Sequence, residues 1–264
     1  DSAFDGDADI AYGLLLAHRQ WGSDGDVDYA GEARRVIGAI LRSTIGPRSR
    51  LPMLGDWTRP DGERHGQYTP RSSDCMIGHF RAYRAATRDR AWAKVVAACQ
   101  SVIASIQQRH SPRTGLLPDF IVNAGSLPES APPGFLEGLQ DGRYYYNALR
   151  DPWRLGTDAV LSGDRLSLAQ ARKMARWIAG ATGGDPQRIR PGYLLDGTPI
   201  PQQPYFTTAF VAPFGVAAMT DPSLQPFLDA IYDAVHARHE DYYQDSLTLQ
   251  ALLVMTGNWW DPSR

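Results

Sequence analysis

The chain opens with the stretch that decides its fold, Asp1-Ser-Ala-Phe-Asp-Gly-Asp-Ala-Asp-Ile-Ala-Tyr-Gly-Leu-Leu-Leu-Ala-His-Arg-Gln-Trp21. Its aspartates, Asp1, Asp5, Asp7 and Asp9, stand directly before or at the start of an apolar face with helical spacing, so a helix begins here. A helix N-terminus favours ionised carboxylates and can hold one at a substrate. Taken alone, the same pattern more often marks N-capping and a solvated loop.

The bulk composition restricts the class of protein. The 264 residues suit one domain or two small ones, and 43% hydrophobic with 21% charged residues is typical of soluble globular proteins. A net charge of −2 provides no field for a polyanion, so nucleic acid is not expected as a partner. No run approaches the roughly 18 apolar residues of a membrane span, so no membrane partner is expected either. Cys75 and Cys99 fit buried thiols, since they form neither a disulfide framework nor a metal pattern.

Helical periodicity dominates the remainder of the chain and predicts about nine helices in all. After the first, they are expected over residues 29–44, 72–86, 90–110, 143–161 with a break near Pro152, 167–182 with Ser167 as cap, 207–219, 223–239 and 242–255. Long loops over 45–71, 115–142 and 183–204 separate them, the last with a possible short hairpin at 193–198. Loops of this length are usually functional or disordered. Helix pairs with long loops on one side favour an all-α ring of helical hairpins over a plain bundle.

A second stretch carries the polar chemistry, Asp141-Gly-Arg-Tyr-Tyr-Tyr-Asn-Ala-Leu-Arg-Asp-Pro-Trp-Arg-Leu-Gly-Thr-Asp158. Its tyrosines precede Asn147, and Trp153 lies between Arg150 and Arg154, which are one helical turn apart. Aromatic rings stack on pyranose faces while amide, guanidinium and carboxylate groups bind hydroxyls, so the pattern fits a sugar-binding cleft. A buried helix with Arg–Asp pairs explains it equally well.

Other catalytic patterns are absent from the sequence. It contains no nucleophile elbow, P-loop, dinucleotide fingerprint or His-x-x-x-His motif, and its six histidines are scattered. His79 lies on an apolar helix, where a core histidine is the simpler interpretation. Carboxylate chemistry in an aromatic-lined groove remains, as in glycoside hydrolysis. Such chemistry requires no metal and no organic cofactor, and none is expected.

The stretch from Ala3 to Trp21 resembles the signature of glycoside hydrolase family 8, which runs Ala-Ser/Thr-Asp-Ala/Gly-Asp, two free positions, Ile/Met-Ala, an apolar run and a closing aromatic. Phe4 departs from it by replacing Ser/Thr. The similarity continues through residues 145–158, 181–185, 208–214 and 257–260. It implies one (α/α)6-barrel catalytic domain over residues 1–264, with an open cleft across one end. It also implies inverting hydrolysis of β-1,4-glucan, mixed-linkage glucan, chitosan or xylan.

The resemblance also implies the general base. Asn147 stands where one branch of the family has an Asp base, and an amide cannot accept the proton of water. The branch of chitosanase-glucanases also has Asn there and takes its base from a Glu in an inserted loop just upstream. Glu137 is the expected base on this resemblance, with Glu129 second.

Further roles follow from the same resemblance. Asp5 is expected to bind and distort the sugar beside the scissile bond, whereas Asp7 and Asp9 are expected to be structural. Trp57, Tyr146 and Arg150 match positions of cleft residues in the family, and Asp74, Asn147 and Trp153 are further expected substrate-binding residues.

The general acid of the family lies in a Glu-Gly/Ser-x-Gly-Tyr-Gly type segment well upstream of the signature aspartate, and this sequence has no such segment. With nine expected helices against twelve in the full barrel, we expect the first helices to be missing and the isolated chain to have little activity. The missing part could be a separate chain. The expected substrate is a β-linked polysaccharide, glucan ahead of chitosan, and the expected enzyme is a secreted or periplasmic monomer. A polysaccharide-binding module without catalysis is the alternative.

Overall fold

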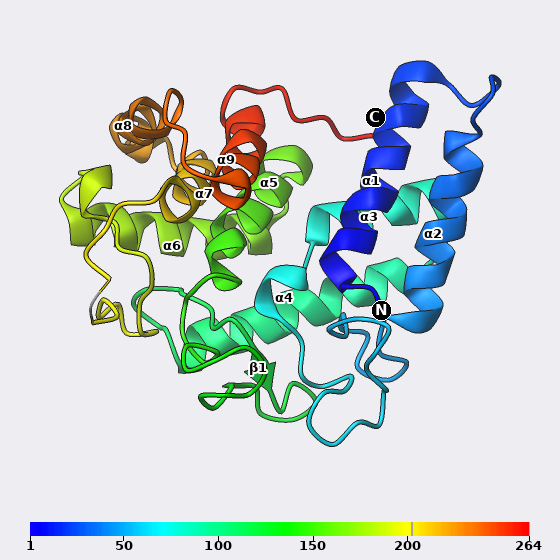
Figure 1. Cartoon of the computed structure of the whole chain (residues 1–264), viewed down its shortest axis with the longest axis horizontal. Helices are drawn as coiled ribbons and strands as arrows, with labels where there is room; N and C mark the ends of the chain where they lie inside the picture. Colours follow the sequence, from blue (N-terminus) through cyan, green and yellow to red (C-terminus); the bar gives the residue numbers. More distant parts are fainter. Residues whose placement is uncertain (202, 264) are drawn as a thin grey trace.

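The computed structural model describes residues 1–201 and 203–263 (Figure 1). Within them the regular structure is almost entirely helical. The α-helices are α1 (Phe4–Trp21), α2 (Tyr29–Ser43), α3 (Ile77–Thr87), α4 (Ala91–Arg109), α5 (Asp151–Ser162), α6 (Arg165–Thr182), α7 (Thr208–Ala218), α8 (Gln225–Val235) and α9 (Tyr242–Met255). Short 3-10 helices cover Ser72–Asp74, Ala148–Arg150, Pro186–Arg188 and Pro222–Leu224. The strands β1 (Ile121–Val122) and β2 (Glu129–Ser130) pair antiparallel, with Ile121 opposite Ser130.

The helices form consecutive hairpins around a curved inner row. The odd-numbered helices α1, α3, α5, α7 and α9 each pack against the next, and α2, α4, α6 and α8 cover them from outside. The long loops lie along the lower side of this row in Figure 1, beside the N-terminus of α1. The predicted arrangement of helical hairpins with loops on one side is therefore confirmed. No helix among the described residues has the length and apolar character needed to cross a membrane.

The inner helices approach one another closely because their contact faces are small or aromatic. A Cβ atom on Gly156 in α5 would lie 2.9 Å from the carbonyl carbon and oxygen of Val216 in α7, so only glycine allows this approach. Phe4, the residue that departs from the family signature, is fully buried and meets the ring of Phe80 at 6.0 Å between centroids. Phe80 in turn stacks on Trp92 of α4. The departure thus contributes to the core that joins α1, α3 and α4.

Several predicted element boundaries are wrong. The helix expected over 72–86 begins only at Ile77, after a 3-10 turn. The helix expected over 143–161 begins at Asp151, and residues 143–147 are not helical. The cap of α6 is Asp164, which accepts the backbone N–H groups of 166 and 167, rather than Ser167. The helix expected over 223–239 is confined to α8, after a 3-10 turn.

Two of the long loops contain short regular features. The possible hairpin at 193–198 is a tight turn: the backbone N–H of Leu194 donates to the carbonyl oxygen of Thr198, and Tyr193 forms isolated antiparallel bridges to Pro199 and to Tyr144. The strands β1 and β2 lie inside the loop 115–142, where the sequence showed no strand pattern.

Candidate active site

Asp5, in the first turn of α1, meets a guanidinium from the beginning of α5. Nη1 of Arg150 donates to Oδ2 of Asp5 at 2.5 Å, and Nη1 of Arg71 lies 4.0 Å from the other carboxylate oxygen. Burial alone would raise the pKa of Asp5, but the positive charges of Arg150 and Arg71 hold it below its ordinary value. Burial alone would lower the pKa of Arg150, but the carboxylates of Asp5 and Asp74 raise it. Asp5 is therefore an ionised group at neutral pH.

Asn147 connects this ion pair to Glu137. Nη2 of Arg150 donates to Oδ1 of Asn147 at 3.1 Å, and Nδ2 of Asn147 donates to Oε2 of Glu137 at 2.8 Å. The other oxygen of Glu137 accepts from Nη2 of Arg71 at 3.3 Å. Because the Glu137 side chain remains 49% exposed, its carboxylate is anchored and still open to solvent. Asp5, Arg150, Asn147 and Glu137, which lie far apart in the sequence, thus form one chain of hydrogen bonds.

Buried Asp119 fixes the backbone that carries Asn147. Its Oδ1 accepts the backbone N–H groups of Tyr145, Asn147 and Ala148 at 3.0, 3.2 and 2.7 Å, and its Oδ2 accepts from Nδ2 of Asn147 at 3.4 Å. These bonds keep residues 145–148 out of the helix that the sequence predicts there. Burial raises the pKa of Asp119 to about 7, more than its hydrogen bonds lower it.

Buried Asp141 does the same for the loop that carries Glu137. Its Oδ2 accepts the backbone N–H groups of Leu136 and Glu137 at 2.7 and 3.1 Å, and its Oδ1 accepts that of Gly138 at 2.9 Å. Two internal carboxylates therefore position the two partners of the Asn147–Glu137 hydrogen bond.

Asp74 lies beneath the surface of the site, where it contacts Arg71. It is fully buried, and its Oδ2 accepts from Nη1 of Arg71 at 3.4 Å. Burial raises its pKa to about 6 despite the nearby guanidinium of Arg71. Asp74 therefore contacts Arg71 and is not exposed to a substrate, which does not fit its predicted role in substrate binding. Arg71, which bridges three carboxylates, was missed by the sequence reasoning, because no spacing or motif marks an arginine at the end of a loop.

Aromatic side chains lie on two segments that adjoin the charged group. The loop that carries Trp57 is tied to the chain just before Asp5, since the backbone N–H of Ser2 donates to Oδ1 of Asp56 at 2.8 Å. Trp57 is 42% exposed and meets the edge of His65. Tyr146, next to Asn147 in the chain, lies among aromatic residues that the sequence reasoning missed: its hydroxyl is 3.1 Å from that of Tyr205, and its backbone oxygen accepts from the Tyr243 hydroxyl at 2.7 Å.

Two candidates lie apart from this cluster. Trp153 is 3% exposed and packs edge-on against Trp259, so it belongs to the core rather than to the exposed site. Trp153 was expected to line the site because it stands in a polar stretch of the sequence, but it lies on the buried side of α5. Glu129, the second candidate for the base, lies on β2, where it accepts a hydrogen bond from Asn123 at 3.3 Å.

A separate ion cluster lies further along α1. Asp9 accepts from Nε2 of His79 at 2.8 Å and from Nη2 of Arg154 at 3.0 Å. His79 is buried, as expected of a core histidine, and burial lowers its pKa despite the bond to Asp9. Within the described residues, no group of three or more His, Cys, Asp or Glu is arranged to hold a metal ion.

Comparison with known proteins places this geometry in a family. A sequence model described as glycosyl hydrolases family 8 matches residues 1–257. The chain is 41% identical over 98% of its length to a β-glucanase of Niallia circulans, of which it covers 63%. It is 38% identical over 99% of its length to an endoglucanase of Bacillus sp. (strain KSM-330), of which it covers 55%. The chain thus spans about half to two thirds of the length of these relatives.

Solved structures agree with the sequence comparison. The apo β-1,3-1,4-glucanase from Paenibacillus sp. X4 matches with a TM-score of 0.94 at 41% identity, over 98% of this chain and 68% of that chain. Rex8A from Paenibacillus barcinonensis, in complex with xylose, matches with a TM-score of 0.77 at 20% identity, over 97% of this chain and 67% of that chain, and supports the fold alone. The predicted fold class, an all-α arrangement of the (α/α)6-barrel type, is confirmed.

Proposed function

The chain belongs to glycosyl hydrolases family 8, and on that basis we propose that it provides the cleft and the general base of an endo-acting enzyme that hydrolyses β-1,4-linked glucan, including mixed-linkage glucan. The observation that carries the proposal is the hydrogen-bonded group of Asp5, Arg150, Asn147 and Glu137. It lies in a chain 41% identical to a β-glucanase over nearly its whole length. The flanking aromatic residues Trp57 and Tyr146 provide faces on which glucose rings stack.

Glu137 is proposed as the general base of an inverting reaction. Its carboxylate is fixed by Asn147 and Arg71 and half open, so a water molecule can bind between it and the sugar. In such a step the water oxygen bonds to the anomeric carbon, its proton passes to Glu137, and the bond to the leaving oxygen breaks. That oxygen takes a proton from a general acid, with the two carboxyl groups about 6.5–9.5 Å apart. Asn147 cannot replace the base, because an amide does not accept this proton.

Asp5 is proposed to bind the sugar at the scissile bond. The arginines that lower its pKa keep it negatively charged. A fixed negative charge stabilises the positive charge that develops on the sugar ring in the transition state, and it accepts hydrogen bonds from sugar hydroxyls.

We propose that the general acid comes from a segment outside residues 1–264. Asp74 and Asp119 have raised pKa values, as a general acid needs, but both are buried. Neither can touch a glycosidic oxygen, so neither fits the role. A binding module without hydrolysis is the competing function, and it is favoured if no acid is ever supplied.

Assays on lichenan, carboxymethylcellulose and chitosan, of the enzyme together with the segment that supplies its general acid, test the substrate, and proton NMR of the first-formed anomer tests inversion. We expect lichenan and carboxymethylcellulose to be cleaved internally with an α-anomer released. Preferential cleavage of chitosan would make a chitosanase the main activity. Oligosaccharide binding by calorimetry without release of reducing ends would identify a binding module. Because the polymers cannot enter a cell, we propose a secreted or periplasmic location, which cell fractionation tests.

A further inference from the structure

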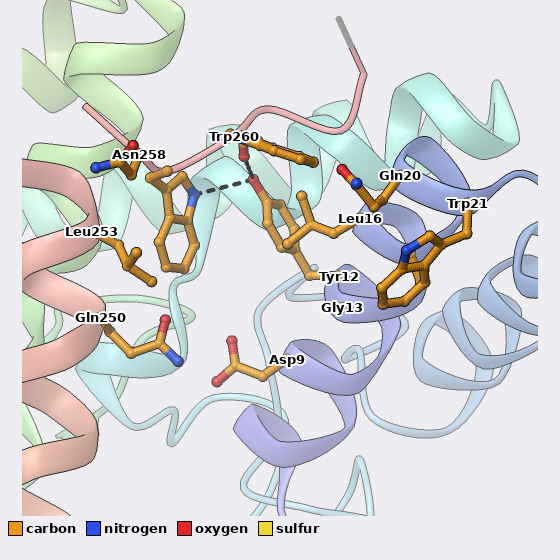
Figure 2. Close-up of a pocket in the computed structure, with 12 residues that line it drawn as sticks. Asp9, Tyr12, Gly13, Leu16, Gln20, Trp21, Gln250, Leu253, Asn258 and Trp260 are labelled. Carbon is orange, nitrogen blue, oxygen red and sulfur yellow. Dashed lines mark hydrogen bonds between the residues drawn. The ribbon is translucent and has the colours of Figure 1, made fainter. Parts of the chain in front are cut away.

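Two cavities away from the active site differ in their chemistry. The first, of about 350 Å³, lies beside Tyr12 and Trp259 and is lined mainly by aromatic, aliphatic and amide side chains (Figure 2). The second, the arginine groove, has a volume of about 670 Å³ and lies between α3 and α4. Alanine, valine and glutamine side chains line it together with four arginines, Arg81, Arg84, Arg88 and Arg90. None of the described residues that line it is acidic or aromatic.

The composition of the chain does not account for the charge of the groove. The whole chain has a net charge of −2, yet four of the ten residues 81–90 are arginines and only Asp89 among them is acidic. One of the four is neutralised: Nε of Arg81 lies 2.8 Å from Oδ1 of Asp158, and its Nη2 lies 3.0 Å from Oδ2 of Asp164. Arg81 therefore forms a wall of the groove whose charge is already balanced.

The other three arginines of the groove are unpaired. Within the part of the chain that the structure describes, the side chains of Arg84, Arg88 and Arg90 have no carboxylate partner and no hydrogen bond. Asp89, their acidic neighbour in the sequence, caps the start of α4, where its Oδ1 accepts the backbone N–H of Ala91 at 2.8 Å. Three guanidinium groups with free N–H donors thus line one groove.

Two of these three arginines stand where the local structure disfavours them. Arg88 ends α3 with a φ of 58°, in the left-handed region that favours glycine. Arg90 is the N-cap of α4, where the positive end of the helix dipole repels a cation, and the first turn of α4 contains no acidic residue. Arg84, in the last turn of α3, has a position that suits its charge. Residues kept at a cost to stability are typical of a site that serves a ligand.

We propose that the arginine groove is a binding site for a polyvalent oxyanion that carries two or three carboxylate or phosphate groups. A guanidinium presents a fork of N–H donors that matches the two oxygens of such a group. Three unpaired guanidinium groups around one groove favour several charges on one ligand over a single monovalent ion. The volume lies within the range of small-ligand sites, about 300–1,000 Å³. Without an aromatic side chain the groove offers no face on which a neutral sugar stacks.

The groove lies at the end of the α3–α4 hairpin that is opposite the long loops. α3 begins and α4 ends at those loops, whereas the unpaired arginines lie at the C-terminal end of α3 and in the short connection 88–90. A bound anion therefore reduces the repulsion between the arginines and joins the end of α3 to the start of α4. It stabilises the folded chain without competing for the proposed glucan cleft.

Isothermal titration calorimetry at constant ionic strength tests the groove with citrate, tripolyphosphate and trigalacturonate, and with acetate as the monovalent reference. We expect at least one of the polyvalent anions to bind one-to-one, at least tenfold more tightly than acetate, and to raise the midpoint of thermal unfolding. Arg88→Gln and Arg90→Gln should each raise its dissociation constant at least fivefold. Lys94→Gln is the matched control, because it removes one positive charge from an exposed position of α4 outside the groove lining. It should change the dissociation constant less than twofold.

The probes also separate the possible sources of the anion. Binding of citrate or trigalacturonate without tripolyphosphate assigns the groove to carboxylates, and the reverse assigns it to phosphates. Two outcomes overturn the proposal. One is that no polyvalent anion binds more tightly than acetate. The other is that Arg88→Gln and Arg90→Gln weaken binding no more than Lys94→Gln does, which places the anion elsewhere or in a diffuse field. Because none of these measurements requires hydrolysis, the groove and the proposed activity can fail independently.

Discussion

Nδ2 of Asn147 lies 2.8 Å from Oε2 of Glu137, and the carbonyl end of the same amide accepts from Arg150. One amide therefore aligns a carboxylate on a loop with an arginine that holds Asp5. An amide can do this without competing for the proton of water, which is consistent with the proposed role of Glu137 as the base. The positioning of Glu137 depends on residues that are themselves fixed by buried groups.

Glu137→Gln should lower kcat about 100- to 10,000-fold with little change in KM, the range by which a general base accelerates such reactions. Glutamine keeps an oxygen that can accept from Asn147 but cannot take the proton of water. A dinitrophenyl β-cellobioside is the substrate to use, because its leaving group departs without a proton and the result is independent of the general acid.

Glu129→Gln is the control for this measurement. Glu129 lies on β2 and bonds Asn123, so its loss should leave kcat unchanged. A large loss with Glu129→Gln and none with Glu137→Gln would reverse the assignment of the base.

Arg150→Lys should reduce kcat by about 10- to 100-fold, because an ammonium cannot reproduce the fork that bonds both Asp5 and Asn147. Lysine keeps the positive charge but loses the hydrogen bond from the Arg150 guanidinium to Asp5, so the pKa of Asp5 should rise toward its ordinary value, which a carbon-detected NMR titration would measure. Arg176→Lys is the control for this variant. It changes an ion pair of the same length at a distant position in the sequence, in which Nε of Arg176 lies 2.5 Å from Oδ2 of Asp221. It should leave kcat as it is. Equal losses in both variants would show a general effect on folding.

Asp141→Asn should lower kcat about tenfold or more while KM changes little. The amide offers one acceptor oxygen, and its NH2 group would face a backbone N–H of residues 136–138. One buried donor left without a partner costs about 1–3 kcal/mol, enough to release the loop that carries Glu137. Hydrogen exchange at 136–138 should accelerate, whereas Asp185→Asn, at an exposed cap, should affect neither reading. Unchanged kcat in Asp141→Asn would show that the loop does not depend on this carboxylate.

The helices could be predicted from the sequence where an apolar stripe with a period of 3.6 residues decides burial, as in α4 and α6. Prediction failed where side chains compete for backbone donors. The N–H groups of residues 145–148 bond Asp119 across the fold, and no local pattern reveals that partner. The start of α5 is delayed to Asp151 for this reason.

The site was predicted in part. Asn147 and Arg150 lie in a motif whose residue types fit sugar binding, Asp5 lies in an acidic helix start whose sugar-binding role came from the resemblance, and the structure brings the three together. Glu137 could be selected only through the family resemblance, since a carboxylate in a loop has no pattern of its own. Arg71 could not be selected from the sequence, because the three carboxylates that it contacts lie on separate elements. Trp153 was expected to be exposed because its neighbours in the sequence are polar, but it is buried.

The raised pKa of Asp74 gives a pH dependence of stability with a definite sign. A carboxyl whose pKa is about 6 when folded and 3.8 when unfolded binds more protons in the folded state between these values. Its stabilising contribution is complete below about pH 4 and is lost as the pH rises through 6, a change of about 3 kcal/mol at most. Urea unfolding from pH 4 to 7 should therefore show a flatter decline in Asp74→Asn than in the wild type. Asp24→Asn, at an exposed position, should follow the wild type; a variant of Asp74 that does so too would contradict the shift.

The location of the general acid decides which substrates the chain alone can hydrolyse. If the general acid lies outside residues 1–264, the chain alone should hydrolyse dinitrophenyl β-cellobioside measurably, because a good leaving group needs no protonation, and should fail on lichenan, whose leaving oxygen does. Adding the part of the Niallia circulans β-glucanase that this chain does not match, as a separate polypeptide, should then raise lichenan hydrolysis at least a hundredfold and the dinitrophenyl reaction far less. Comparable turnover of lichenan by the chain alone would place the acid within it. The loss of both activities in the complex of Glu137→Gln would show that the two carboxyl groups act in one site.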